Sequence, residues 1–250
     1  MKVTVVGCAG SFPGPDTSSS CYLVQAEGFT AVLDLGNGSL GQLQRYATVA
    51  DIDAVLLSHL HADHCMDVLP LYVARTYDPK GRHPVLPVHA PAGAEAHLSQ
   101  AYGRVDSPGL GACFAFREWS AGTHRVGPFE ITAARVAHPV DTWGLRIEHD
   151  GRVLAYSADT GPCDALVELS RGADLALFES SFEAERDRSA PADLHMTGGQ
   201  AGQQAAAAGV GRLVLTHLPP WNDPALSLAA GQAAFDGPVE VATPGATYEL

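Results

Sequence analysis

Basic side chains are scarce in this sequence. Its 250 residues hold 15 lysines and arginines against 28 aspartates and glutamates, which gives a formal net charge of −13. Tight binding of RNA or DNA relies on Lys and Arg contacts to phosphates, and a strongly negative protein repels a long polyanion. We therefore expect no nucleic acid among the partners, although a pocket with divalent cations can still attract one phosphate or carboxylate.

Cysteine pairs and long apolar runs are also missing. The five cysteines are an odd number without a Cys-x-x-Cys pair, which argues against a disulfide framework and suits reduced thiols. No apolar run approaches the ~20 residues that cross a membrane, and the run at residues 1–7 is too short for a signal peptide. We expect a soluble, cytoplasmic protein without a membrane partner.

The chain is long enough, and at 46% hydrophobic residues apolar enough, for one large core. It shows neither a linker nor a short-period repeat, so we expect a single domain over residues 1–250. Segments typical of strands and of helices mix in both halves, which favours a sandwich with helices outside two central sheets. We predict strands over residues 2–6, 21–26, 29–35, 54–58, 84–89, 114–119, 129–137, 144–149, 152–157, 175–178 and 212–216, and helices over residues 39–47, 66–77, 91–102, 162–170 and 197–208.

The densest group of functional side chains lies in residues 59–64, which read His-Leu-His-Ala-Asp-His. They follow the apolar run 54–58, which predicts a buried strand, so the side chains emerge at the end of that strand. Imidazole nitrogen and carboxylate oxygen are ligands that zinc, manganese and iron accept, and a short loop reduces the entropy lost in gathering them. A solvated, His-rich loop is the alternative, but the spacing and the strand end favour metal coordination.

The pattern His-x-His-x-Asp-His after a hydrophobic strand resembles the signature of the metallo-β-lactamase superfamily. The resemblance implies an α/β fold, the four-layer αβ/βα sandwich with two central mixed β-sheets flanked by helices, and a two-metal site at one edge. It also requires a lone His, an Asp and a last His at later strand ends, and His138, Asp159 and His217 stand in such places. An Asp-x-Gly turn at Asp34 would lie beneath the metal loop as a supporting residue.

The resemblance implies seven ligands in two sets that share one carboxylate: His59, His61 and His138 for the first metal, Asp63, His64 and His217 for the second, and Asp159 as the bridge. We expect two zinc ions, with manganese or iron as alternatives, because these ligand types accept all three metals. Two ligands have structural alternatives when taken alone. His138 precedes Pro139, which restricts its backbone, and Asp159 lies where it could cap the following helix.

A second motif narrows the branch of the superfamily. Residues 178–182 and 194–201 resemble the Glu-containing strand end and the His-x-Thr segment of the transfer-RNA 3′-processing endonucleases and related phosphodiesterases. The resemblance implies that His195 protonates the leaving oxygen and that Glu179 orients the ring of His195. Together with Asp63, these two residues are the catalytic residues that we assign. The structural alternative for His195 is an N-cap or loop residue before the helix at Thr197.

The long substrate-binding arm of those endonucleases has no place here, because only 20 residues separate His138 from Asp159. From its opening at residues 7–13 to residues 215–221, the chain is similar to small actinobacterial phosphodiesterases that degrade cyclic nucleotides. The resemblance implies hydrolysis of a small phosphodiester, cAMP first, to the 5′-nucleotide, and relatives of this size suggest a homodimer.

Three other functions stay open at this point. A trimmed, ribonuclease Z-like RNA 3′-processing endonuclease would prefer structured RNA to cyclic mononucleotides. A thiolester or lactone hydrolase could use the same metals, although it would have no need of His195. A metal-stabilised scaffold would bind metal without turnover. The remaining histidines match no motif position, and we expect them to be ordinary surface or packing residues: His83, His89, His97, His124 and His149.

Overall fold

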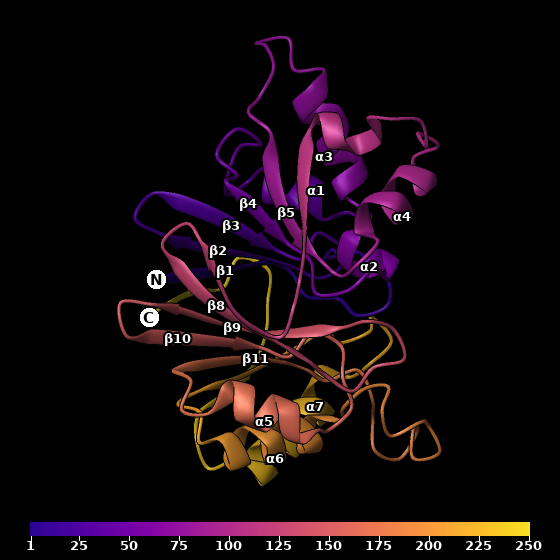
Figure 1. The fold of residues 1–250 in the computed structure, drawn as a ribbon. Coiled ribbons are helices and arrows are strands. Elements are labelled where there is room, and N and C mark those ends of the chain that lie inside the picture. Colours follow the sequence, from indigo (N-terminus) through magenta and orange to yellow (C-terminus); the bar gives the residue numbers. More distant parts are fainter.

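The computed structural model describes all 250 residues and consists of two seven-stranded sheets that pack face to face (Figure 1). The first sheet contains, in spatial order, β14 (Thr247–Glu249), β1 (Lys2–Gly7), β2 (Cys21–Ala26), β3 (Phe29–Leu33), β4 (Ala54–Leu56), β5 (Leu86–Ala90) and β6 (Phe114–Glu118). The second contains β13 (Val239–Val241), β12 (Leu213–Thr216), β11 (Leu175–Glu179), β10 (Arg152–Tyr156), β9 (Trp143–His149), β8 (Phe129–Arg135) and β7 (Gly122–Val126). Both sheets mix parallel and antiparallel pairs, so the predicted sandwich of two central mixed sheets is confirmed.

Helices cover the outer face of each sheet (Figure 1). The first half of the chain contributes α1 (Ser39–Leu43), α2 (Ala62–Cys65), α3 (Val68–Thr76), α4 (Ala94–Ala101) and the 3-10 helix η1 (Gly109–Ala112). The second half contributes α5 (Asp164–Ser170), α6 (Gly198–Ala208) and α7 (Pro224–Ala234). No helix is long and apolar enough to cross a membrane.

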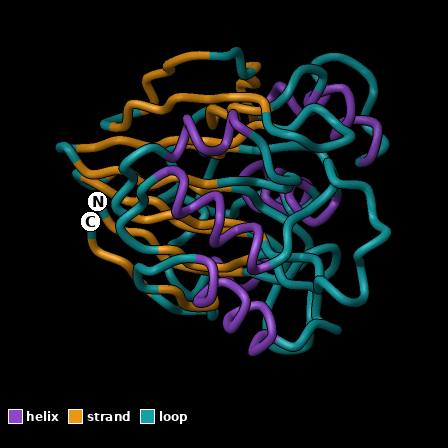
Figure 2. The backbone as a smooth tube through the Cα atoms, turned by 90° about the horizontal axis from the view of Figure 1, so that it is seen from below, coloured by secondary structure: helices purple, strands orange, loops and turns teal.

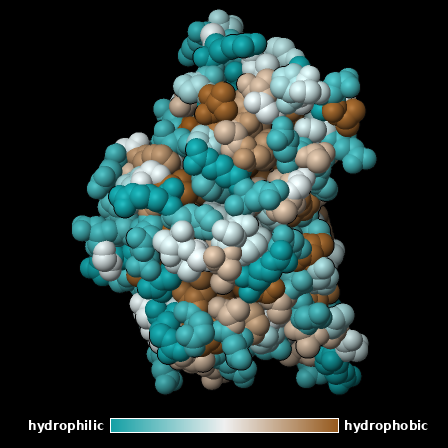
Figure 3. Space-filling view, viewed as in Figure 1, coloured by the Kyte–Doolittle hydropathy of each residue, from teal (hydrophilic) through white to brown (hydrophobic).

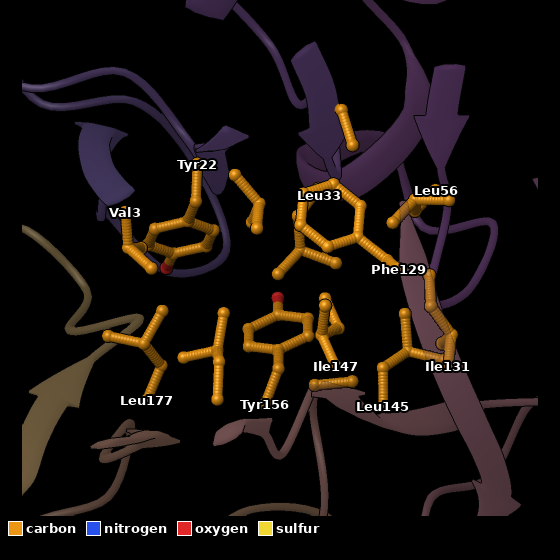
Figure 4. Close-up of a cluster of buried hydrophobic side chains, with 14 of the residues drawn as sticks. Val3, Tyr22, Leu33, Leu56, Phe129, Ile131, Leu145, Ile147, Tyr156 and Leu177 are labelled. Atoms are coloured by element: carbon orange, nitrogen blue, oxygen red, sulfur yellow. The ribbon is translucent and has the colours of Figure 1, made fainter. Parts of the chain in front are cut away.

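The core between the two sheets follows from strand alternation. In β10, Leu154 and Tyr156 face the opposite sheet, while Val153 and Ala155 face the helices on the outside. A strand buried on both faces must be apolar throughout, which explains its continuous apolar run. Figure 4 shows Tyr156 facing Tyr22 of the other sheet across this core, with their ring centroids 5.5 Å apart. Each hydroxyl finds a buried partner near the edge where the strands end.

The strands that precede the predicted ligands all end at one edge. β3 and β4 run parallel, β10, β11 and β12 run parallel, and β9 is antiparallel to both of its neighbours, so β8 has the direction of β10. The chain termini lie together at the other end, where Met1 N donates to Leu250 O at 2.9 Å. Figure 2 shows loops gathered at the end opposite the termini. The fold therefore brings the loops with functional side chains to one place.

The boundaries of several elements differ from the predicted ones. The helix expected over residues 39–47 ends at Leu43, because bonds such as Tyr46 N to Leu43 O tighten the last turn. The helix expected from residue 91 begins at Ala94, because Gly93 before it is left-handed. The sequence prediction missed β7, β13, β14 and α7, and also the short helices α2, which begins inside the expected metal loop, and η1. Helix α7 has small and apolar residues on all sides, so it shows no clear amphipathic periodicity. The signal that indicates it is the N-cap Asp223 followed by Pro224.

The face of the molecule in Figure 3 is largely hydrophilic, with hydrophobic side chains scattered over it. Among the large hydrophobic residues, Val105, Trp221 and Tyr77 are the most exposed, at 73%, 64% and 63%. Isolated exposed apolar side chains are normal on soluble proteins and need no explanation. Trp221 differs from the other two because it borders the cavity of the functional site.

Candidate metal centre

The seven predicted ligands lie together at the edge where the strands end. They form two groups, and within each group the ligand atoms lie within 4.8 Å of one another: His59, His61, His138 and Asp159 in one, and Asp63, His64, Asp159 and His217 in the other. These are the two sets that the resemblance implied, with Asp159 in both. The residues that the sequence separates by up to 158 positions thus share one site.

A single helical turn positions the ligands of the His-x-His-x-Asp-His segment. His61 is the N-cap of α2, and the turn carries Asp63 and His64 inward, where both are buried. The carbonyl of His64 accepts from Leu35 N at 2.7 Å, which fixes the turn on the segment after β3. Gly36 allows this approach, because a Cβ there would lie 1.9 Å from the carbonyl oxygen of Asp63.

Left-handed backbone conformations concentrate around the site. A left-handed residue with a side chain costs roughly 1–2 kcal/mol, so such residues persist where the surroundings enforce them. The chain has six outside glycine, and two of these are hairpin-turn residues. The other four lie in the site or directly beside its ligands: Ser11 (φ 64°), Asp34 (φ 52°), Ala158 (φ 54°) and His217 (φ 56°). The strand ends therefore turn sharply here and aim their side chains into one place.

The first ligand set consists of three histidines and one carboxylate oxygen. His61 Nδ1 lies 3.1 Å from His59 Nε2 and 3.4 Å from His138 Nε2, and Asp159 Oδ2 lies 3.6 Å from His59 Nε2. Burial disfavours the charged ring and lowers the pKa of each of these three histidines below its ordinary value. Neutral imidazole, with a free lone pair, is the form that binds a metal.

The second set is buried and richer in carboxylates. His217 Nε2 lies 3.0 Å from His64 Nε2 and 3.1 Å from Asp63 Oδ2, and Asp159 Oδ1 lies 3.1 Å from His64 Nε2. Burial opposes a charge on His64, but Asp159 and Asp34 outweigh it and raise the pKa of His64 well above its usual value. The negative field of these carboxylates attracts positive charge, which a proton or a bound cation can supply.

Asp34 organises the ligands from behind. Its Oδ2 accepts hydrogen bonds from His64 Nδ1 at 2.8 Å, from the hydroxyl of Ser58 at 2.8 Å and from the hydroxyl of Tyr156 at 2.7 Å. Because the Ser58 hydroxyl donates to Asp34, it accepts from Nδ1 of His59 at 3.0 Å. The protons on Nδ1 leave Nε2 of both rings free to bind a metal. As predicted from the sequence, Asp34 supports the site and lies outside both sets of ligands.

The other two Nε2 ligands are oriented in the same way. Nδ1 of His138 lies 2.8 Å from the carbonyl oxygen of Leu194. Because a carbonyl oxygen can only accept, Nδ1 carries the proton and donates. Nδ1 of His217 lies 2.8 Å from the hydroxyl of Ser181, which donates to the carbonyl of His217 and so accepts from the ring. The sequence analysis missed Ser58, Tyr156 and Ser181, because a hydroxyl at a strand end carries no motif of its own.

The residues fit two divalent cations. Four ligand atoms about 2.1 Å from a zinc ion lie about 3.4 Å from one another in a tetrahedron, and the ligand separations given above are 3.0 to 3.6 Å. The Nε2 atoms of His64 and His217 face each other with both Nδ1 atoms engaged, so a cation or an extra proton must lie between their lone pairs. Asp159 Oδ1 is buried and accepts no hydrogen bond, which leaves it for the same cation.

His195 and Glu179 lie beside the ligands without belonging to the two sets. Nδ1 of His195 donates to Glu179 Oε1 at 2.7 Å, and its ring centroid is 5.4 Å from that of His138 and 5.9 Å from that of His217. Burial disfavours the charged ring, but Glu179 outweighs burial and raises the pKa of His195 to about 9. The helix after this segment is capped by Thr197, so His195 is not its N-cap. His195 lies in the loop before the helix, with its ring bonded to Glu179 beside the ligands.

Glu179 is itself held firmly. It is buried, and its carboxylate accepts from the backbone N–H groups of Thr160, Ser181 and Met196 at 2.8, 3.2 and 3.3 Å. These bonds fix the carboxylate, and through it the ring of His195. The remaining predicted catalytic residue, Asp63, lies in the second ligand set, and its Oδ2 also accepts from Ser11 N at 2.7 Å. Asp63 therefore lies among the candidate metal ligands.

Comparisons with known proteins agree with this site. Residues 30–218 match the family described as beta-lactamase superfamily domain. An uncharacterised protein of Mycobacterium leprae is 42% identical over all of this chain and 89% of its own length. The probable metallo-hydrolase YhfI of Bacillus subtilis is 32% identical over the whole of both chains, and its crystal structure matches with a TM-score of 0.87 at 30% identity, covering 100% of this chain and 99% of that one.

A ribonuclease Z of Myxococcus xanthus is 29% identical over all of this chain and 98% of its own length. The predicted superfamily and its ribonuclease Z-like branch are thereby confirmed. The histidines and aspartates of the site, the family match and the metallo-hydrolase relative agree with one another. The chain belongs to the β-lactamase superfamily and is a metal-dependent hydrolase of the ribonuclease Z-like branch.

Proposed function

We propose that this hydrolase is a binuclear phosphodiesterase whose substrate is a 3′,5′-cyclic nucleotide, cAMP, which it opens to the 5′-monophosphate. The observation that carries the proposal is the pair of His195 and Glu179 beside two complete sets of metal ligands. Hydrolysis of an activated ester needs metals and water alone, whereas a sugar alkoxide is a poor leaving group that needs a proton. A histidine fixed next to the metals serves such a leaving group.

The residues divide the reaction between them. Two bound divalent cations, zinc or alternatively manganese or iron, supply the Lewis acidity that activates water and stabilises charge on the phosphoryl group. Glu179 accepts a hydrogen bond from Nδ1 of His195 and thereby presents Nε2 of the ring to the substrate. The bond from the water oxygen to phosphorus forms, the bond from phosphorus to O3′ breaks, and O3′ takes the proton of His195. The water gives up one proton to solvent, and His195 regains one from solvent, so protons balance over the cycle.

The size of the site supports a small substrate. His195 borders a cavity of about 630 Å³, which is within the range of pockets for small ligands. The chain between His138 and Asp159 forms only β9, the turn at Asp150 and Gly151, and β10, so it carries no arm for an RNA. Apart from His195, Arg186 is the one basic residue that borders the cavity, whereas a groove for RNA needs several.

RNA 3′ processing is the second candidate, because the ribonuclease Z of Myxococcus xanthus matches the whole chain. The two functions share the metals and the proton donor and differ in what surrounds the phosphate. Under this alternative, a surface outside the cavity would replace the arm, and the enzyme would cleave structured RNA in preference to a cyclic mononucleotide.

The test is a product assay on purified protein of known metal content. It is incubated separately with cAMP, cGMP, bis(p-nitrophenyl) phosphate, a precursor transfer RNA and a thiolester, each with and without EDTA. We expect EDTA-sensitive conversion of cAMP to AMP. Cleavage of the RNA or the thiolester without turnover of cyclic nucleotides would overturn the proposal. Bound metal without turnover of any substrate would instead identify a metal-stabilised scaffold.

A further inference from the structure

An exposed tryptophan borders the cavity beside His195. The exposed fraction of Trp221 is 64%, whereas Trp119 and Trp143, the other two tryptophans of the chain, are each 5% exposed. The cavity lining also includes Pro219, two positions before Trp221 in the sequence. An indole exposed at the wall of a substrate cavity offers a large, flat and apolar face to a ligand.

The structure holds Trp221 in place. The ring of Phe12 packs against it, with centroids 4.7 Å apart and planes at 48°. The two loops are joined by backbone bonds, since Leu218 N donates to Cys8 O at 3.2 Å and Gly10 N donates to Leu218 O at 3.1 Å. These loops carry the indole and the phenyl ring a few residues further on. The platform is thus formed before a ligand arrives, which reduces the entropy cost of binding.

Asn222 and Arg186 anchor the other side of this segment. The Asn222 amide donates to Ser181 O at 2.9 Å and accepts from Arg186 Nη1 at 2.9 Å. Nε and Nη2 of the same guanidinium bind Asp187 at 2.6 to 3.0 Å, and Glu183 lies 3.7 Å away. Its charge is therefore offset by carboxylates, and each of its three nitrogens already donates a hydrogen bond. This part of the cavity suits an uncharged planar ring better than a further phosphate.

We propose that the face of Trp221, backed by Phe12, is the surface on which the nucleobase of the substrate stacks. The inference rests on the proposed function, which places the leaving oxygen of the phosphodiester at His195, and His195 lines the same cavity as Trp221. Every base has a π face, so stacking favours substrates with a base over those without one and discriminates little between bases. Phe12 acts as a positioning residue, because it contacts the indole.

The first experiment compares kcat/KM for cAMP with kcat/KM for ribose 3′,5′-cyclic phosphate, which has the same phosphodiester but no base. Trp221→Ala should lower the ratio of the two values by about tenfold or more, the scale of a lost base stack. Trp221→Phe should restore most of it, and Phe12→Ala should lower it less. The matched control is Tyr77→Ala. Tyr77 is an aromatic residue with a similar exposed fraction, 63%, but it does not border the cavity. An unchanged ratio in Trp221→Ala would overturn the inference.

A second experiment separates this inference from the proposed function, because it needs no turnover. Acrylamide quenches the fluorescence of exposed indoles, and Trp221 is the exposed one of the three. Saturating AMP should protect the protein from quenching by twofold or more, and ribose 5-phosphate should not. Protection by AMP without cAMP hydrolysis would support the stacking surface and reject the phosphodiesterase. Equal quenching with AMP and with ribose 5-phosphate would reject the stacking surface even if cAMP is hydrolysed.

Discussion

The two ligand sets share Asp159 but differ in their surroundings. The first set is open to solvent, since His61 is exposed and His138 half-buried, and its only carboxylate is the shared one. The second set is buried, contains Asp63 as well as Asp159, and has Asp34 directly behind His64. Burial is the largest influence on the pKa of the three histidines of the first set and lowers it, whereas in the second set Asp159 and Asp34 outweigh burial and raise the pKa of His64.

This difference suggests a division of labour. Two negative carboxylates and low solvent exposure strengthen the attraction of the second set for a divalent cation, because charges interact more strongly in a less polar medium. The first set, with more imidazole and more water, should exchange its metal more readily. The predictions below test this contrast, beginning with the residue that belongs to both sets.

Replacing Asp159 should have the largest effect. Asp159→Asn keeps the shape of the side chain but removes the negative charge that both sets share, and its amide nitrogen cannot bind a cation. We expect loss of metal from both sets and a drop in turnover of about 10³-fold, which corresponds to several kcal/mol of lost charge stabilisation. Metal content by atomic emission, measured with phosphodiesterase activity, checks this. A fully metallated, active variant would show that the bridge lies elsewhere.

Removing one histidine from each set should give unequal results. His61→Ala should lose one metal equivalent and leave the folding free energy of the metal-free protein nearly unchanged, because the ring is exposed. His64→Ala should lose metal and also destabilise the metal-free protein by about 1–3 kcal/mol, because Asp34 loses a buried donor.

Native mass spectrometry and urea unfolding in EDTA measure the two effects on His61→Ala and His64→Ala. In the wild type, a chelator should remove the metals in two phases. The metal of the first set, which His61→Ala lacks, should leave first. Simultaneous release of both metals from the wild type would contradict the proposed contrast between the sets.

The pair of His195 and Glu179 belongs to neither set, so its loss should leave both metals in place. His195→Ala should lower turnover of cAMP by about 10²-fold, the usual scale for a lost general acid, with normal metal content. Turnover of bis(p-nitrophenyl) phosphate by the same variant is the matched comparison. Its nitrophenolate leaves without a proton, so its turnover should fall far less. Loss of metal from His195→Ala would mean that the residue is a ligand.

Much of this site can be predicted from the sequence, because each ligand is marked by the few residues on either side of it. His138, Asp159 and His217 each follow an apolar run and precede a turn, and residues 59–64 hold four ligands together. The positions of all of these at one end of the two packed sheets follow once the strands are placed. The superfamily, the fold and the hydrolase class were predictable for the same reason.

The orienting contacts are different, because they depend on where distant strands meet. Nothing in the apolar run around Tyr156 shows that its hydroxyl reaches Asp34, which is 122 positions away in the sequence. The same is true of Ser181 and His217, and of the stack of Phe12 on Trp221. Strand alternation places Tyr156 in the core, but the register between two sheets determines which polar group it meets.

The smallest effect that we predict comes from this cross-sheet contact, and the chain offers a matched control for it. Tyr156 and Tyr22 are both buried between the sheets, but the Tyr156 hydroxyl donates to Asp34, whereas the Tyr22 hydroxyl bonds with Thr216 at 2.6 Å. Each Tyr→Phe change removes one buried hydrogen bond and should cost about 1 kcal/mol of unfolding free energy.

Only Tyr156→Phe should also weaken metal binding, by about tenfold, because Asp34 then holds His64 and Ser58 less firmly. A competition titration with a chelator indicator measures the affinity of both variants. Since the second set depends directly on Asp34 through His64, and the first only through Ser58, the weaker binding should appear in the slowly released metal. Equal affinities in Tyr156→Phe and Tyr22→Phe would mean that Asp34 needs no support from the opposite sheet.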